Sequence, residues 1–455
     1  MSHPPGDGNR ATGADEVIDQ TLGHRLLPRR IHYGWWITIG IAALMFGTLG
    51  VGYYGLAVFL RPLQEENGWS NTAVSGATGL YFTVSGITGF FLGPLVDRHG
   101  PRRFLIAGVL LVGLAAIALG SVSTLLGLYV VYIVQAVAFG LAGTVGINSI
   151  MARWFVTRRA KAMSISATGI SLGGIVLSPV GSWLVGQGGV ALAAPTLGIL
   201  VLVVGMPIVL FVLVWDPSDV GEKPDFGRPD PSADAIAMSD DVQLRVWTRA
   251  EAARTVAFWA ILVGFVLVLM AQTGFLLHQI AFLEDRFNSR EAAALTLSTT
   301  AFGSVVARLI VGQVADRLDK VWLSAGLFTV QGLSVLGVLA VENRVITFLF
   351  VLIIGFTIGN IYLMQTLLVA EKFGLVSLGT VLGVVGLAVQ VGSGAGPLLV
   401  GWLEDRSGGY TLPFILSAAT TLVSAVVIMA AKAPIGDPQT SEQPSLNWVA
   451  DGSQP

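Results

Sequence analysis

The chain contains no cysteine and little charge. Of its 455 residues only 12% are Asp, Glu, Lys or Arg, while 53% are hydrophobic. The lack of cysteine excludes disulfides and thiolate metal sites. A soluble domain carries about 25% charged residues, so the low charge over this length excludes a soluble enzyme with one large core and indicates a protein that crosses a membrane many times. The formal net charge of −2 gives no indication of a nucleic-acid partner.

The sequence also lacks the patterns of a secreted chain and of a catalytic centre. The first 30 residues are polar and contain no apolar stretch of the kind found in signal peptides, so residues 1–30 are expected to be a cytoplasmic tail. No nucleotide-binding loop, metal-ligand cluster or nucleophile beside a base stands out. We therefore expect no enzymatic activity and no cofactor. Residues 434–455 are again polar and predict a second cytoplasmic tail.

Long apolar segments fill the rest of the chain. A bilayer core of about 30 Å needs roughly 20 apolar residues per helix, and these segments are too long and too uniformly apolar for strands. They predict an all-α membrane protein with twelve transmembrane helices, near residues 34–60, 72–95, 103–121, 124–152, 161–187, 190–215, 253–283, 290–315, 320–341, 345–370, 376–403 and 409–432. Residues that typically cap a helix N-terminus precede the second, seventh and eighth expected helices. They are Ser70, Thr248 with Glu251, and Asn288 with Glu291.

Basic residues are distributed unevenly between the two sides of the membrane. Of the 26 lysines and arginines, 20 fall on the side of the termini and five on the other side, if the chain crosses twelve times. Positive charge marks the cytoplasmic side, so both termini are expected inside. The polar stretch 216–252 is then a cytoplasmic linker between one six-helix half at 31–215 and a second at 253–433.

The two halves repeat each other. Two groups of residues in the first half recur in the second at an almost constant offset, which indicates duplication. The offset is 219 residues for Gly93, Asp97 and Arg98, which match Gly312, Asp316 and Arg317, and 218 for Phe155, Gly174 and Pro179, which match Phe373, Gly392 and Pro397. Two six-helix halves are a known transporter architecture, with the substrate bound near the middle of the membrane between them.

The first repeated group lies in a longer motif at residues 93–103, GPLVDRHGPRR. This motif resembles the signature that the major facilitator superfamily carries between its second and third helices. The resemblance covers essentially the whole helical region. It implies the major facilitator fold, in which two pseudo-symmetric halves move a substrate by alternating access.

The resemblance also implies a gate at the cytoplasmic side. Asp97 would lie against the start of helix eleven, where the helix dipole attracts a carboxylate, and would close the two halves together with Arg98 and Arg102. Asp316 and Arg317 would form the weaker counterpart against helix five. The plainer alternative is that these charged residues set the topology and end helices.

Three further motifs resemble the monocarboxylate transporter and oxalate/formate antiporter branch of that superfamily. They are Tyr33-Gly34-Trp35, the run WFVTRRAKAMSISATGISLG at residues 154–173, and Ala307-Arg308 followed by Gly312. In this branch the arginine of the eighth helix binds the substrate carboxylate, so the resemblance implies that role for Arg308.

Two departures from the branch limit what the resemblance implies. Ser304 stands where the animal members carry an aspartate, and no lysine occurs between Val376 and Leu403, where the oxalate antiporter has one. The proton-coupling residues of the animal members are therefore not carried over to this chain. The missing second cation disfavours a substrate with two carboxylates.

Arg308 stands out without any resemblance. An arginine near the middle of a membrane costs at least about 2.5–3.5 kcal/mol, and no Asp or Glu lies in the interior of an expected helix to offset its charge. A planar guanidinium without a counter-ion suits an incoming carboxylate. The alternative is a structural arginine that backbone carbonyls satisfy.

Other polar residues inside the expected helices are weaker candidates for substrate binding. His278 is expected to reach the same cavity as Arg308, where it either assists the carboxylate and carries a proton or only bonds a neighbouring helix. The remaining candidates are Asn148, Tyr362, Gln390 and Tyr53, although intramembrane polar groups more often hold helices together.

These observations predict a secondary active transporter of a small organic anion, a monocarboxylate, in the plasma (cell inner) membrane. Proton symport is the leading hypothesis and carboxylate exchange is the alternative. A membrane sensor of the same fold that binds without transporting fits less well. The expected partners are the carboxylate, protons and the lipid bilayer, and the protein is expected to be monomeric.

Overall fold

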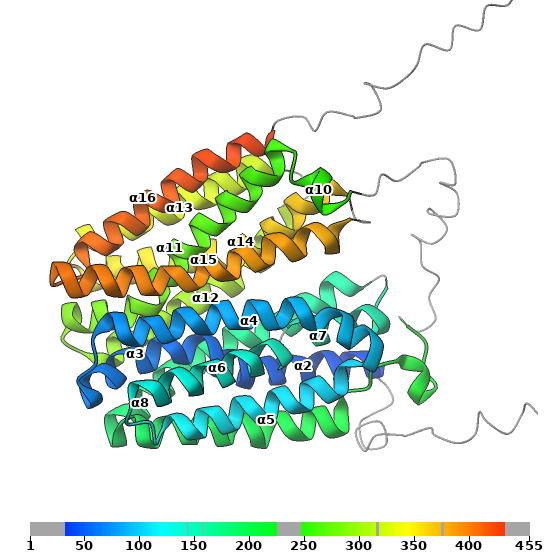
Figure 1. Ribbon diagram of the computed structural model, residues 1–455, viewed down its shortest axis with the longest axis horizontal. Coiled ribbons are helices and arrows are strands. Elements are labelled where there is room, and N and C mark those ends of the chain that lie inside the picture. Colours follow the sequence, from blue (N-terminus) through cyan, green and yellow to red (C-terminus); the bar gives the residue numbers. More distant parts are fainter. Residues whose placement is uncertain are drawn as a thin grey trace, which may run out of the picture.

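The computed structural model describes residues 32–142, 144–156, 158–224, 247–314, 318–374 and 377–432, and over these ranges all regular structure is helical (Figure 1). Within them, nine helices are long and apolar enough to cross a membrane. The chain is therefore an all-helical, multi-pass membrane protein.

The helices that precede the linker run from residue 33 to residue 220. In chain order they are α2 (Tyr33–Leu49), the π-helix η1 (Gly50–Tyr54), α3 (Gly55–Asn67), α4 (Asn71–His99), α5 (Pro101–Leu119), α6 (Leu125–Ala142), α7 (Thr144–Trp154), α8 (Arg159–Pro207), the π-helix η2 (Ile208–Val212) and the short 3-10 helix η3 (Pro217–Val220). Helical geometry is interrupted inside α8 at Gly188 and Gly189, the latter with a φ of +65°. This break divides α8 into two arms, which correspond to the fifth and sixth expected segments.

The helices that follow the linker begin with a single turn. They are α10 (Arg249–Ala252), α11 (Val256–Phe287), α12 (Arg290–Val314), α13 (Lys320–Ala340), α14 (Arg344–Phe373), α15 (Leu378–Ser407), α16 (Thr411–Met429) and η6 (Ala430–Lys432). Two expected segments, 72–95 and 290–315, form the long helices α4 and α12, which are not among the nine most apolar spans.

One of the three expected caps is confirmed and two need correction. Ser70 accepts a hydrogen bond from the Ala73 amide at the start of α4. Thr248 forms its capping box, but the box begins α10, and α11 is capped by Thr255 instead. The prediction for Asn288 is wrong: with a φ of +51° it ends α11 in the left-handed region, a conformation that asparagine tolerates.

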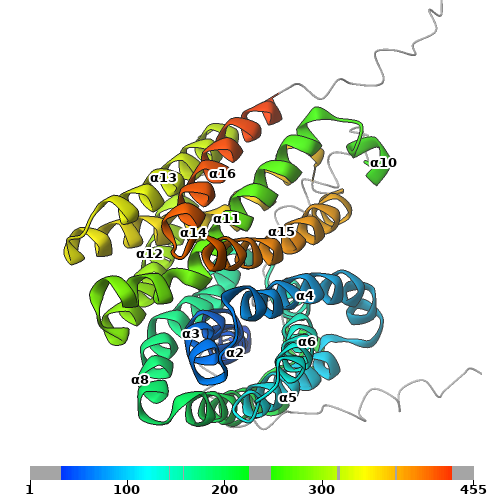
Figure 2. The same cartoon turned by 60° about the vertical axis from the view of Figure 1, so that its left-hand side comes forward.

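The helices before and after the linker form two groups that face each other, α2 to α8 on one side and α11 to α16 on the other (Figure 2). Three pairs of helices cross between the groups, α4 with α15, α8 with α12, and α3 with α11. The first crossing needs small residues, because a Cβ on Gly79 would lie 2.5 Å from the carbonyl oxygen of Gly394.

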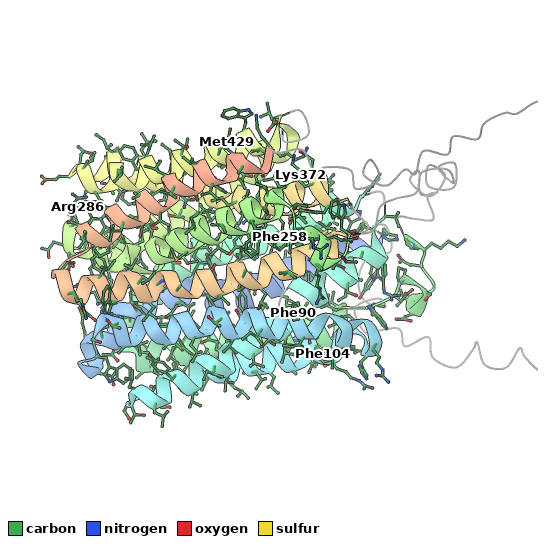
Figure 3. The ribbon with its side chains drawn as sticks, turned by 45° about the horizontal axis from the view of Figure 1, so that its top comes forward. Phe90, Phe104, Phe258, Arg286, Lys372 and Met429 are labelled. Carbon is green, nitrogen blue, oxygen red and sulfur yellow. The ribbon has the colours of Figure 1, made fainter. Side chains whose placement is uncertain are left out.

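The bundle has two ends, which we name by their glycines. At the Gly68 end, α3 and α15 finish in glycines with a positive φ, Gly68 and Gly408, and Arg286 lies at this end of α11 (Figure 3). At the opposite, Gly100 end, α4 finishes at Gly100, and Lys372 lies near the last residue of α14.

Candidate functional site

Arg308 lies in α12, six residues before the last one that the structure describes in this helix, which is about 9 Å at 1.5 Å per residue. Its side chain is half-buried and points across the interface to α8. Nη1 donates to the hydroxyl of Ser171 at 3.1 Å and to the carbonyl of Ala167 at 3.3 Å. Within the described residues these bonds use Nη1 alone, so Nε and Nη2 keep their hydrogen-bonding capacity.

Hydroxyl groups surround the guanidinium. Ser171 from α8 and Ser304 from α12 are fully buried, and their Oγ atoms lie 2.9 Å apart. Tyr54 interacts with Ser304 and lies within electrostatic range of Arg308. We call these four residues, Arg308, Ser171, Ser304 and Tyr54, the Arg308 cluster. The sequence reasoning did not include Ser171, although it falls within the motif at 154–173, and of the two neighbouring tyrosines it selected Tyr53 instead of Tyr54.

The π-helix η1 positions Tyr54 and its neighbour Tyr53. A π-helical turn accommodates an extra residue and occurs frequently at functional sites. Here it lies against α8, since a Cβ on Gly50 would come within 2.8 Å of the Cα of Gly173. Tyr54 packs over Gly174, while the ring of Tyr53 faces Phe82 of α4 at 5.9 Å between centroids. The two tyrosines therefore lie on different sides of the same turn.

No carboxylate neutralises Arg308 in the part of the chain that the structure describes. Every ion pair found there lies elsewhere, and the only charged or ionisable neighbour in range is Tyr54. Ser304, one helical turn before Arg308, occupies the position at which an acid would be nearest. The same residues contain no group of His, Asp and Glu that could hold a metal ion.

His278 does not join the Arg308 cluster. It is fully buried in α11, where Nε2 lies 3.2 Å from the carbonyl of Pro397 and 3.3 Å from Oγ of Ser75, and Nδ1 lies 3.4 Å from the hydroxyl of Tyr410. A carbonyl can only accept, so the proton is assigned to Nε2, and Nδ1 then accepts from Tyr410. The neutral ring is thus satisfied by α4, α15 and Tyr410.

The other candidates for substrate binding are spread along the interface between the groups. Tyr53 and Tyr362 lie within electrostatic range of each other, and Tyr362 is 40% exposed although it lies deep in α14. Gln390 of α15 donates to Ser85 of α4 at 3.3 Å. Asn148 is half-buried on α7 and has no side-chain hydrogen bond to the Arg308 cluster.

The structure describes some of the residues that are expected at the cytoplasmic gate. The side chain of Asp97 and the whole of Asp316 and Arg317 lie outside the described residues. Arg98 is exposed at the end of α4. Arg102 donates to the carbonyl of Leu210 at 2.9 Å, which is a contact within the first group of helices.

The Gly68 end carries ionic contacts between the two groups that the sequence reasoning missed. Arg61 of α3 pairs with Asp285 of α11 at 2.5 Å, and Arg290 of α12 pairs with Glu65 of α3 at 3.2 Å. Acids and bases near helix ends look like solvent-facing residues in a sequence, so only their spatial pairing shows this role.

A second contact at the same end joins α15 to the start of α4. The carboxylate of Asp405 accepts from the backbone amides of Asn71 and Thr72, at 3.0 and 2.7 Å, and from the Thr72 hydroxyl at 2.5 Å. Asn71 also donates to Glu404 and to Tyr410, both at 2.9 Å. A carboxylate at a helix N-terminus is favoured by the helix dipole, so this contact holds α15 of the second group against α4 of the first.

The described ion pairs at the Gly100 end stay within one group of helices. Arg153 pairs with Asp216 at 2.9 Å in the first group, and Lys320 pairs with Glu371 at 2.9 Å in the second. Among the described residues, the ion pairs between the groups are therefore confined to the Gly68 end.

Comparison with known proteins identifies relatives for this arrangement. The sequence model of the Major Facilitator Superfamily matches residues 40–395, and again 280–449. The chain is 24% identical over 423 residues to Monocarboxylate transporter 13 of Rattus norvegicus, covering 89% of this chain and 90% of the relative. It is 25% identical over 231 residues to the Oxalate:formate antiporter of Oxalobacter formigenes, covering 50% of this chain and 51% of the relative.

A solved structure supports the fold. A crystal structure of a bacterial homologue of the human lysosomal transporter Spinster, in an inward-facing and unoccupied conformation, superposes with a TM-score of 0.58. The match covers 88% of this chain and 95% of that chain, at 15% sequence identity.

Proposed function

The chain belongs to the Major Facilitator Superfamily, and from this premise we propose that it is a secondary active transporter of a small monocarboxylate. Its relatives include monocarboxylate transporters and an oxalate:formate antiporter. The transport cycle is alternating access, in which the site opens to one side of the membrane at a time.

The observation that carries this proposal is the state of Arg308. Its guanidinium is half-buried between α8 and α12, has no carboxylate partner among the described residues, and keeps Nε and Nη2 free of hydrogen bonds. A fork of donors binds a carboxylate bidentately. The substrate then supplies the counter-ion that the protein omits, and the hydroxyl of Tyr54 adds a hydrogen-bond donor beside it.

The topology of the proposed transporter has twelve transmembrane helices in two six-helix halves, 31–215 and 253–433. This proposed count is supported by the nine most apolar spans if α8 is taken as two arms and α4 and α12 are also counted as spans. Both termini lie in the cytoplasm, so the Gly68 end faces outward. Asp97, Arg98, Arg102, Asp316 and Arg317 form the inner gate, and the plasma membrane is the location.

Coupling to a proton is the proposed mechanism. A proton that enters with the anion makes the net charge carried across the membrane zero, so an inside-negative membrane potential does not oppose uptake. Exchange of one carboxylate for another is the second candidate. It is favoured by Ser304, which leaves no acid next to Arg308 to carry a proton, and by His278, whose ring nitrogens are bonded away from the Arg308 cluster.

Uptake into proteoliposomes tests the proposal. Labelled lactate, pyruvate and formate are offered to wild type, to Arg308→Ala and to Arg254→Ala, a control that removes an exposed arginine near the start of α11. We expect uptake to be lost in the first variant and kept in the control. Equal uptake by Arg308→Ala and wild type would contradict the carboxylate role.

The same vesicles separate the two coupling mechanisms. An inward proton gradient without any internal anion drives uptake if the transporter is a symporter. Uptake that requires a preloaded carboxylate and ignores the gradient identifies an exchanger.

A further inference from the structure

Gln272 of α11 is a buried polar residue that the protein leaves without a full set of partners. It is 2% exposed, and neither its amide oxygen nor its amide nitrogen has a well-formed hydrogen bond. Burying an amide without hydrogen bonds costs free energy, so an unpaired group in a native structure needs an explanation. Gln279, two turns further along the same helix, shows the ordinary structural use: its amide nitrogen donates to Thr296 at 3.0 Å and to Thr300 at 3.2 Å.

The side chains near Gln272 come from three other elements, and one of them, Ser393, is likewise unpaired. Tyr53 of η1 lies near the amide without forming a well-formed hydrogen bond to it, and Tyr362 of α14 lies within electrostatic range of Tyr53. Tyr362 approaches Ser393 of α15, whose Oγ is fully buried and likewise lacks a well-formed bond. A hydrogen bond joins the two helices that carry Gln272 and Ser393: the Thr273 hydroxyl of α11 donates to the carbonyl of Ser393 in α15 at 2.9 Å.

This polar group borders the Arg308 cluster. Tyr53 and Tyr54 are consecutive residues with ring centroids 5.3 Å apart, and Tyr54 reaches Ser304 and Arg308. A small pocket lined by Tyr53, Tyr54 and Thr273, the residue after Gln272, lies between the two groups of helices beside these side chains, and Tyr362 is 40% exposed. The Arg308 cluster, which contains Tyr54, and the side chains near Gln272, which include Tyr53, therefore adjoin at these two consecutive tyrosines.

We infer that Gln272, with Tyr53, Tyr362 and Ser393, forms a second substrate subsite that binds an uncharged oxygen of the transported acid. The substrate class is a hydroxy- or oxo-monocarboxylate, whose carboxylate meets Arg308. An amide offers both a donor and an acceptor, and a hydroxyl does the same, so this subsite accepts either a hydroxyl or a keto oxygen.

The chemistry of the subsite excludes a second carboxylate. The four side chains carry no positive charge, and the lysines and arginines of α11, α14 and α15 lie at helix ends, at Arg286, Arg344, Lys372 and Arg406. A second anionic group would be buried there without a cation. This inference rests on the proposed function, since it assumes that Arg308 holds a carboxylate.

Ligand-induced thermal stabilisation of purified protein tests the inference with matched acids. Lactate and pyruvate are compared with propionate, and 3-hydroxybutyrate with butyrate, so that only the second oxygen differs within a set. We expect wild type to prefer the oxygenated acid by about tenfold or more, because the unsubstituted acid leaves Gln272 unpaired. Gln272→Leu is expected to abolish this preference while retaining binding that depends on Arg308.

Gln135→Leu is the matched control, since Gln135 is also a buried glutamine with an unpaired amide oxygen but lies in α6. It should keep the preference of wild type. The inference is overturned if wild type binds both members of each set equally, or if Gln272→Leu keeps the preference. If no monocarboxylate in the set stabilises wild type more than Arg308→Ala, the proposed function fails and this inference fails with it.

Gln272→Leu itself should fold. Replacing an unpaired buried amide with an apolar side chain of similar size is neutral or stabilising, so its melting temperature without ligand is expected to equal or exceed that of wild type. A pronounced loss of stability would show that the amide has a structural role and would overturn the inference.

Discussion

The hydroxyl oxygens of Ser171 and Ser304 lie 2.9 Å apart, and this hydrogen bond joins α8 to α12 one turn before Arg308. Ser304 places no negative charge beside Arg308, so the guanidinium keeps donors for an incoming anion. A substitution at Ser304 therefore changes the charge balance at this crossing.

Ser304→Asp is expected to make uptake depend on an acidic pH. The new carboxylate lies one turn from Arg308 and competes with the substrate for its free nitrogens, so uptake at pH 7.5 should fall by about tenfold, in line with a charge-assisted hydrogen bond. Protonation of the aspartate at lower pH should restore uptake. Ser304→Asn, which cannot ionise, should show no such recovery, and a recovery there would contradict the explanation.

Asp405→Asn is expected to loosen the Gly68 end. The change weakens three hydrogen bonds to the first turn of α4, so the open form should be populated severalfold more. The chain has no cysteine, so a single Ala57→Cys, one turn inside Arg61, reports access cleanly. We expect a membrane-impermeant thiol reagent to label it faster in Asp405→Asn, whereas Glu342→Gln at the same end leaves the rate unchanged.

Gly79→Val is expected to abolish the close crossing of α4 and α15. The added side chain would run into the carbonyl of Gly394, and overpacking of this kind costs about 1–3 kcal/mol. Melting temperature and uptake should both fall. Gly89→Val on the same helix is the matched control, because nothing lies within 4 Å of its added Cβ. Similar losses in both variants would assign the effect to valine in a helix instead of the crossing.

The cap of α13 should give a stability difference that depends on pH. The Asp319 carboxylate accepts from the amides of Trp322 and Val321, both at 2.9 Å, and these bonds lower its pKa below the usual 3.8. A lowered pKa means that the ionised cap stabilises the fold above pH 3.8 and that this contribution is lost as the pH falls through the lowered value.

Asp319→Ala should therefore melt earlier than wild type at pH 7, by an amount equivalent to about 1 kcal/mol for a lost cap. The difference should shrink as the pH falls below 4. Melting curves of the two proteins at a series of pH values check this expectation. A gap that stays constant down to pH 3 would mean that the ionised carboxylate contributes nothing.

The sequence alone predicted the helices and singled out Arg308. Uniform apolarity over about 20 residues leaves a backbone in a bilayer few options besides a helix, and the cost of a buried guanidinium marked Arg308 before any contact was known. The sequence did not indicate a role for Ser171, because a serine in an apolar helix is common and its role depends on which helix crosses it.

His278 shows what sequence position alone leaves out. Counting residues gives the depth of a side chain along its own helix but not the direction in which it points. The packing of α11 against α15 turns His278 to the carbonyl of Pro397, and Ser75 of α4 lies beside the same ring nitrogen. The cap pattern at Asn288 failed for a related reason, since asparagine favours the left-handed end of one helix as well as the start of another.

The π-helix at residues 50–54 has a further consequence for the way in which α3 faces its neighbours. Each residue of an α-helix advances the side chains by about 100°, so the extra residue in η1 sets the angular phase of everything that follows it in α3. Arg61 and Glu65 meet α11 and α12 only in that phase. The turn that carries Tyr53 and Tyr54 therefore also determines which residues of α3 face α11 and α12 at the Gly68 end.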